Sequence, residues 1–124
     1  MAPLFTEREL DVMAVLWDHG PSTAAEVREQ IADPLAYNTV LSMLRILEEK
    51  GHVKHVEDGR AHRYIAKVAR EAAGTSALNR VVDKVFQGSP EFLLTHFMRD
   101  RSLDADELRR LRRILDERLA EEEK

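Results

Sequence analysis

The side chains best suited to reading a polar partner lie close together between residues 37 and 50. Asn38, Ser42 and Arg45 follow one another at spacings of four and three residues, which places them on one face of a helix. An arginine can donate two parallel N–H bonds to O6 and N7 of guanine, an asparagine can pair with adenine, and a serine hydroxyl can contact either base. The pattern therefore predicts a helix face that reads base edges.

Neighbouring residues extend the same chemistry. Leu41 is unusual on a solvent-facing helix surface but suits contact with a thymine methyl group. Tyr37 and Thr39 stand at the start of the helix, where hydroxyls and the helix dipole both favour phosphate. A merely solvated polar face is the alternative, and the helix taken alone does not decide between the two.

A basic hairpin is predicted directly after this helix. The segments "HVKHV" and "AHRYI" flank "EDGR", and Asp58-Gly59 is typical of a two-residue type I′ turn. That register sets Val53 opposite Tyr64, His55 opposite His62 and Lys54 opposite Arg63. The cationic side chains expected to contact phosphates along the hairpin are Lys54, Arg60, Arg63 and Lys67.

The histidines of the hairpin raise the question of a metal site. His55 and His62 would be placed to chelate together, but no third ligand is evident, cysteine is absent, and His52 alternates onto the other face. We therefore predict no metal and no cofactor. Stacking or phosphate contact is the preferred role, and His62 is assigned to the nucleic-acid contacts.

Charge is distributed unevenly along the chain. The protein has a net charge of -4 over 124 residues, yet residues 36–70 hold seven lysines and arginines against four aspartates and glutamates. A basic island on an acidic body is typical of a protein that meets an anionic partner with one face only.

The elements that would position these residues form a helix-turn-helix and a wing. A capping box at Thr6 and Glu9 begins the first helix, and Gly20-Pro21 ends it. A second helix begins at Ser22 or Thr23 and ends before Pro34. The third covers roughly residues 37–50 and buries the stripe Val40, Met43, Leu44 and Leu47. The fold class is therefore mainly α with a small β-hairpin, with a winged helix-turn-helix DNA-binding domain in residues 1–67.

Residues 68–124 are predicted to be helical and to have a different role. Helices are expected at about residues 68–86, after Ser89-Pro90, and after Asp104. Their apolar stripes exceed what a small winged domain can cover, which favours a symmetric homodimer over helices that fold back on their own domain. The expected interface residues are Val82, Phe86, Phe92, Leu93, Phe97, Met98, Leu108, Leu111 and Leu115.

Several function classes are excluded or disfavoured by the sequence. No Gly-rich phosphate loop, HExxH pattern or serine elbow occurs, so the protein is not expected to be an enzyme. The N-terminus lacks the features of a signal peptide, and no apolar run approaches the roughly 18 residues of a membrane span. A cytoplasmic protein without a membrane partner is expected.

The elements "YNTV…L…LEEKG" (residues 37–51) and "DGRAHRY" (residues 58–64) resemble the penicillinase-repressor family of the BlaI/MecI/CopY type. The likeness runs from "TERELDVMAVLW" to the last helix. It implies a bacterial dimeric winged-helix repressor, of the kind that controls β-lactam resistance or copper homeostasis. It further implies an inverted-repeat operator, recognition-helix roles for Thr39 and Ser42, and wing contacts within Arg60 to Arg63.

The resemblance also bears on induction. The β-lactam repressors of the family are cut at an Asn-Phe bond by a membrane-bound sensor protease, and here His96-Phe97 stands at that candidate cleavage site. Copper-responsive members use C-terminal cysteines, which this chain lacks. The expected function is a homodimeric repressor that binds a palindromic operator and is released by an inducing signal. The alternatives are a winged-helix protein-interaction module and a metal-responsive repressor that uses the wing histidines.

Overall fold

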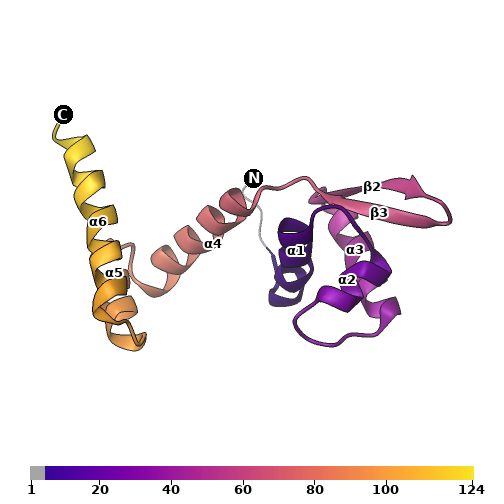
Figure 1. The fold of residues 1–124 in the computed structure, drawn as a ribbon, viewed down its shortest axis with the longest axis horizontal. Helices are drawn as coiled ribbons and strands as arrows, with labels where there is room; N and C mark the ends of the chain where they lie inside the picture. Colours follow the sequence, from indigo (N-terminus) through magenta and orange to yellow (C-terminus); the bar gives the residue numbers. More distant parts are fainter. Residues whose placement is uncertain (1–4) are drawn as a thin grey trace. The chain divides into compact units, whose positions relative to one another are not determined.

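The computed structural model describes residues 5–124 as helices with one small antiparallel sheet (Figure 1). The chain divides into two compact units, Met1–Arg80 and Val81–Lys124. The first contains α1 (Glu7–His19), α2 (Ala24–Gln30), α3 (Tyr37–Glu49) and the strands β1 (Ser22–Thr23), β2 (Val53–Asp58) and β3 (Ala61–Ala66). This order of elements confirms the predicted winged-helix class.

The predicted capping box is present at the start of α1, and a second one is present at the start of α2. The Glu9 backbone N–H donates to Thr6 Oγ1 at 3.1 Å, and the Thr6 N–H donates to Glu9 Oε1 at 2.8 Å. Thr23 and Glu26 repeat the arrangement at 3.2 and 2.9 Å. Each box satisfies N–H groups that the first helical turn leaves without partners, which fixes where these helices begin.

The carboxylate of Glu9 also joins α1 to the end of α3. Its side chain is buried, and Lys50 Nζ donates to Oε2 at 2.8 Å. Burial acts to raise the pKa of Glu9, but the bonds from Lys50 and from the Thr6 backbone outweigh it and hold the pKa below 4.5. The first and third helices are thus fixed to each other by a charged pair as well as by apolar packing.

The core of this unit lies between its three helices and the base of the wing. Val40, Leu44 and Leu47 of α3 are fully buried, as the predicted stripe requires, whereas Met43 is only partly buried at the edge of the core. Val53 and Tyr64 extend the same core into the sheet. One face of α3 is therefore held by packing, and the opposite face is left for solvent or a ligand.

The wing has three strands where the sequence predicted two. The strand order is β1-β3-β2, and β1 pairs with β3 through Ser22 opposite Tyr64 and Thr23 opposite Arg63. A two-residue strand is too short to show the alternation from which strands are predicted. The extra strand attaches the wing to the start of α2.

The predicted register of the hairpin is wrong by two residues in the pairing. Asp58 pairs with Ala61, so Gly59 and Arg60 form the turn rather than Asp58 and Gly59. Gly59 alone takes a positive φ, of 62°, which fits a type II′ turn with glycine first and not the predicted type I′ turn. The true pairs are Val53 with Ala66, Lys54 with Ile65, His55 with Tyr64, Val56 with Arg63 and Glu57 with His62.

The segment that leads from β3 into α4 (Arg70–Val85) is fixed to α1. The indole Nε1–H of Trp17 donates to the carbonyl of Val68 at 2.8 Å. The guanidinium of Arg70 forms an ion pair with Asp18 and lies 5.8 Å from the centre of the Trp17 ring. The first turns of α4 therefore belong to the N-terminal unit.

The second unit contains the end of α4 with α5 (Pro90–Asp100) and α6 (Ala105–Glu122). Ser89 and Asp104 cap these helices, as predicted, with side-chain bonds of 3.1 and 2.8 Å to the N–H groups of Phe92 and Glu107. Phe86 is the one buried side chain of this unit. No helix within residues 5–124 is long and apolar enough to cross a membrane.

Candidate nucleic-acid interface

The polar face of α3 is exposed, as the sequence predicted. Asn38, Ser42 and Arg45 lie on this face, and Arg45 makes no hydrogen bond or ion pair within the described part of the chain. Tyr37 and Thr39 are also exposed at the start of the helix. Leu41 is partly buried and packs against the core, so a smaller part of it than expected is available to a ligand.

A cleft of about 270 Å³ separates the exposed face of α3 from the wing. It brings together five of the predicted contact residues, three from the helix and two from the hairpin. The full lining is Thr23, Ala24, Ala25, Tyr37, Leu41, Arg45, Arg60, Ala61, His62 and Tyr64. Two guanidinium groups at one concave site favour an anionic ligand.

The cleft also contains residues that sequence reasoning missed. Thr23, Ala24 and Ala25 form its wall at the start of α2, and Tyr64 contributes from β3. Ala24 and Ala25 carry no polar or charged group, so only their position in the fold reveals them. Burial raises the pKa of Tyr64.

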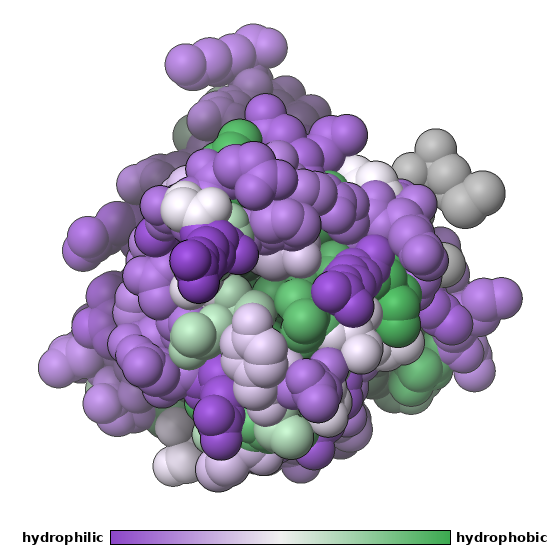
Figure 2. All heavy atoms as spheres, turned by 90° about the vertical axis from the view of Figure 1, so that its right-hand side faces the viewer, coloured by the Kyte–Doolittle hydropathy of each residue, from purple (hydrophilic) through white to green (hydrophobic). Residues whose placement is uncertain are grey.

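Figure 2 shows the side of the N-terminal unit that is at the right in Figure 1. Hydrophilic side chains cover most of this face and surround a smaller apolar area.

Two cationic residues of the wing, Arg60 and Lys54, differ in what they offer to a ligand. Arg60 stands in the turn and has no ion pair with any described residue. Lys54 pairs with Ile65 in the ladder, so it lies on the opposite face of the hairpin from His62. The wing therefore presents Arg60 and His62 toward α3 and Lys54 to the other side.

Arg63 is already bonded within the protein. Its Nε and Nη2 donate to Asp58 Oδ2 at 3.0 and 2.7 Å, and its Nη1 donates to Glu26 Oε1 at 2.9 Å and to the Pro21 carbonyl at 3.0 Å. These bonds, that to Asp58 first, raise the pKa of Arg63. A phosphate contact by Arg63 remains a prediction, and it would have to replace these bonds.

Comparison with known proteins identifies the family. The sequence matches the family described as "Penicillinase repressor" over residues 5–117. The chain belongs to the penicillinase-repressor family. The resemblance drawn from "YNTV" and "DGRAHRY" is thereby confirmed, and the description of the family is that of a repressor.

Family relatives align with nearly the whole chain. The penicillinase repressor of Bacillus licheniformis is 27% identical over 93% of this chain and 91% of its own length. The transcriptional regulator BlaI of Mycobacterium tuberculosis is 37% identical over 88% of this chain and 80% of its own. The methicillin resistance regulatory protein MecI of Staphylococcus aureus is 23% identical over 89% of this chain and 91% of its own length.

Two solved structures resemble the fold. The solution structure of the B. licheniformis BlaI monomeric form, in complex with the blaP half-operator, is 27% identical and covers 58% of this chain and 90% of that one, with a TM-score of 0.50. The complex structure of hsRosR-S4 covers 96% of this chain and 93% of its own, with a TM-score of 0.55. Its sequence identity is 17%, so this likeness bears on the fold alone.

Proposed function

We propose that this penicillinase-repressor family member binds a double-stranded DNA operator through α3 and the wing, and represses transcription from it. In this arrangement Asn38, Ser42 and Arg45 read base edges in a major groove, and Arg60 contacts the adjacent backbone. The observation that carries the proposal is the cleft that joins Arg45 of α3 to Arg60 of the turn. The B. licheniformis BlaI structure with its half-operator supports it.

The remaining predicted contacts fit around this arrangement. Tyr37 and Thr39 stand at the first turn of α3, where exposed hydroxyls can bond phosphates. His62 lines the cleft beside Arg60, and Lys54 is directed to the other side of the hairpin. We assign base reading to α3 and the salt-dependent part of the affinity to the wing.

We further propose that the operator is an inverted repeat and that the protein binds it as a homodimer. The C-terminal unit supports this, because most of its apolar side chains lack cover in the single chain. Phe92 is 47% exposed, Leu108 43%, Leu115 53% and Leu119 56%. A second copy supplies a matching apolar surface by symmetry, and two winged domains then read two half-sites.

Release by an inducing signal completes the proposal. The His96-Phe97 bond is the candidate for cleavage by a membrane-bound sensor protease, and it lies inside α5. His96 packs 5.3 Å from the Phe86 ring, and Arg101 lies 5.4 Å from the Phe97 ring. Cleavage there would require local unwinding. Mass spectrometry of the protein from induced cells distinguishes a cut chain from an intact one.

The direct test is selection of random duplexes by the purified protein at near-physiological salt. An enriched inverted repeat is the expected result, and Arg45→Ala is expected to cost about 1–3 kcal/mol at a single base-pair position of it. Equal weakening on specific and non-specific DNA would make Arg45 a phosphate contact instead. A folded protein that enriches no sequence would favour the alternative of a winged-helix module that binds protein.

A further inference from the structure

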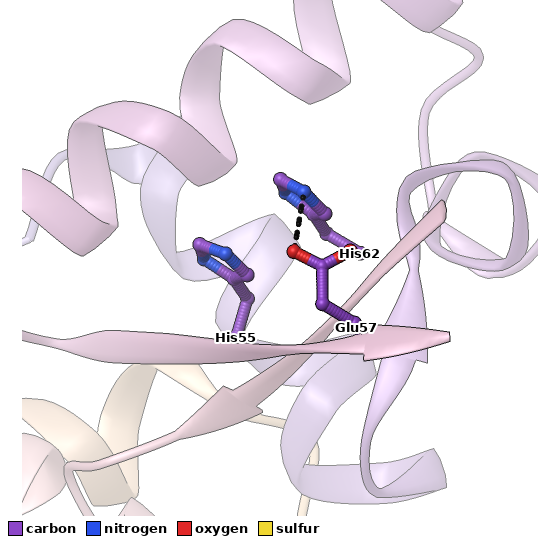
Figure 3. Close-up of side chains that lie close together, drawn as sticks. All are labelled: His55, Glu57 and His62. Atoms are coloured by element: carbon purple, nitrogen blue, oxygen red, sulfur yellow. Dashed lines mark ion pairs between the residues drawn. The ribbon is translucent and has the colours of Figure 1, made fainter. Parts of the chain in front are cut away.

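Three metal-ligating side chains meet on one face of the wing. Because Glu57 is paired with His62 and His55 with Tyr64, the side chains of His55, Glu57 and His62 point to the same side of the hairpin (Figure 3). One ligand atom from each lies within 4.8 Å of the other two. His62 Nε2 is 3.4 Å from Glu57 Oε1. In the observed register Glu57 stands directly opposite His62, in the place that the predicted pairing gave to His55.

We propose that His55, His62 and Glu57 form a binding site for a divalent transition-metal ion of the Zn²⁺ class. Two imidazole nitrogens and one carboxylate oxygen are a donor set that Zn²⁺ accepts, with a water molecule in the fourth position. The side chains of His55 and His62 are 29% and 44% exposed, so an ion can reach them from solvent.

The surroundings of His55 are suited to such a site. Its Nδ1 lies 2.6 Å from Oε2 of Glu48, a residue of α3. Metal-binding histidines commonly donate their second ring N–H to a carboxylate, which fixes the tautomer and the orientation of the ring. With Nδ1–H directed to Glu48, Nε2 of His55 is left to bind the ion. Glu48 is accordingly a positioning residue rather than a ligand.

One rearrangement must accompany binding. The rings of His55 and His62 are stacked at 4.0 Å with an angle of 7° between their planes. The lone pairs of parallel rings run side by side and do not converge on one point. Because Glu48 holds the His55 ring, it is rotation of His62 about its terminal side-chain torsion, which is soft for histidine, that makes them converge. Metal binding therefore unstacks the two histidines without any change in the backbone.

The ion would act next to the DNA-binding cleft. His62 lines that cleft with Arg45 and Arg60, and Glu48 lies on α3, so occupancy fixes a wing side chain relative to the recognition helix. If metal changes the affinity for DNA, DNA must change the affinity for metal by the same factor. This coupling rests on the proposed function, whereas the metal site itself does not.

Calorimetric titration of the full, untagged, chelator-treated protein with Zn²⁺ tests the site without DNA. One ion per chain is expected, with affinity at least tenfold lower in His62→Ala and in Glu57→Gln, and roughly tenfold lower in Glu48→Gln. His19→Ala is the matched control, since His19 is an exposed histidine at the end of α1. Thermal unfolding followed by circular dichroism checks that each variant is folded.

The outcomes separate cleanly. The proposed site is overturned if no saturable binding of Zn²⁺ is found, or if His62→Ala and Glu57→Gln leave the binding unchanged. Loss of Zn²⁺ binding on His19→Ala would place the metal site elsewhere in the chain. Band shifts on operator DNA with and without Zn²⁺ then test the coupling. Metal binding with unchanged DNA affinity overturns the coupling alone. If the protein binds no DNA in either condition, the proposed function fails, and the calorimetry still decides the site.

Discussion

Arg60 and Arg63 are three residues apart in the wing, yet the structure predicts different effects when each is changed to alanine. Arg60 is in the turn and has no ion pair with a described residue. By contrast, Nε and Nη2 of Arg63 donate to Asp58, and its Nη1 donates to Glu26 and to the Pro21 carbonyl. Arg60→Ala is expected to reduce the salt dependence of DNA binding. Arg63→Ala is expected to leave the salt dependence nearly unchanged and to lower the stability of the wing.

The size of the effect follows from counterion release. Each neutralised phosphate contributes about 0.9 to the slope of log K against log salt concentration. Arg60→Ala should therefore lower the slope by about 0.9. Between 50 and 200 mM salt, one such contact accounts for a loss of roughly 3.5-fold in affinity, so the wild type should lose about 3.5-fold more affinity over that range than the variant.

Fluorescence anisotropy on a labelled non-specific duplex, at four or more salt concentrations, measures the slopes. Arg109→Ala is the matched control, because it removes the same charge from α6 in the C-terminal unit, where Arg109 pairs with Asp106. The double variant Arg60→Ala with Arg63→Ala should differ from the wild type by about 0.9. A difference of about 1.8 would mean that Arg63 leaves its internal partners for phosphate, and the reasoning from its bonds would be refuted.

Three further outcomes are expected. Glu9→Gln should lower the free energy of unfolding in urea at pH 7 by about 1–3 kcal/mol. Because the pKa of Glu9 is lowered in the folded state, the pair stabilises the fold most at neutral pH, and the difference between wild type and variant should shrink as the pH falls below 4.5. Leu44→Ala should cost about 2–5 kcal/mol in the same assay, since Leu44 is fully buried, and a smaller loss would indicate a loosely packed core. Leu115→Arg should halve the mass found by sedimentation equilibrium without unfolding α6, because Leu115 is exposed in the single chain. The control Arg112→Ala should leave that mass unchanged. An unchanged mass for Leu115→Arg would place the dimer interface elsewhere.

Features encoded locally were predictable from the sequence. The two capping boxes need only residues three apart, and the buried stripe of α3 follows from its helical spacing. The face of α3 opposite this buried stripe must be exposed, so the same helical spacing predicted that Asn38, Ser42 and Arg45 lie together on it. For such elements each residue's position depends on near neighbours alone.

Features that depend on distant residues were not predictable. Asp58 looked like a turn residue, but it sits in the ladder, and its carboxylate accepts two bonds from Arg63. Arg63 in turn bonds Pro21 and Glu26, which are about forty positions earlier in the chain. The strand β1, which pairs Thr23 with Arg63, belongs to the same long-range contact. A hairpin read by itself carries no sign of it.

The contact between Trp17 and Val68 gives the protein a built-in optical probe. Trp17 is the sole tryptophan of the chain, and its indole N–H is bonded to the segment that connects the wing to α4. Indole emission shifts to longer wavelength when the ring becomes hydrated, so release of this segment should be visible without any label. Because Trp17 packs at the edge of the core of the N-terminal unit, a shift that precedes the loss of helical circular dichroism would report the detachment of α4 before the unit unfolds.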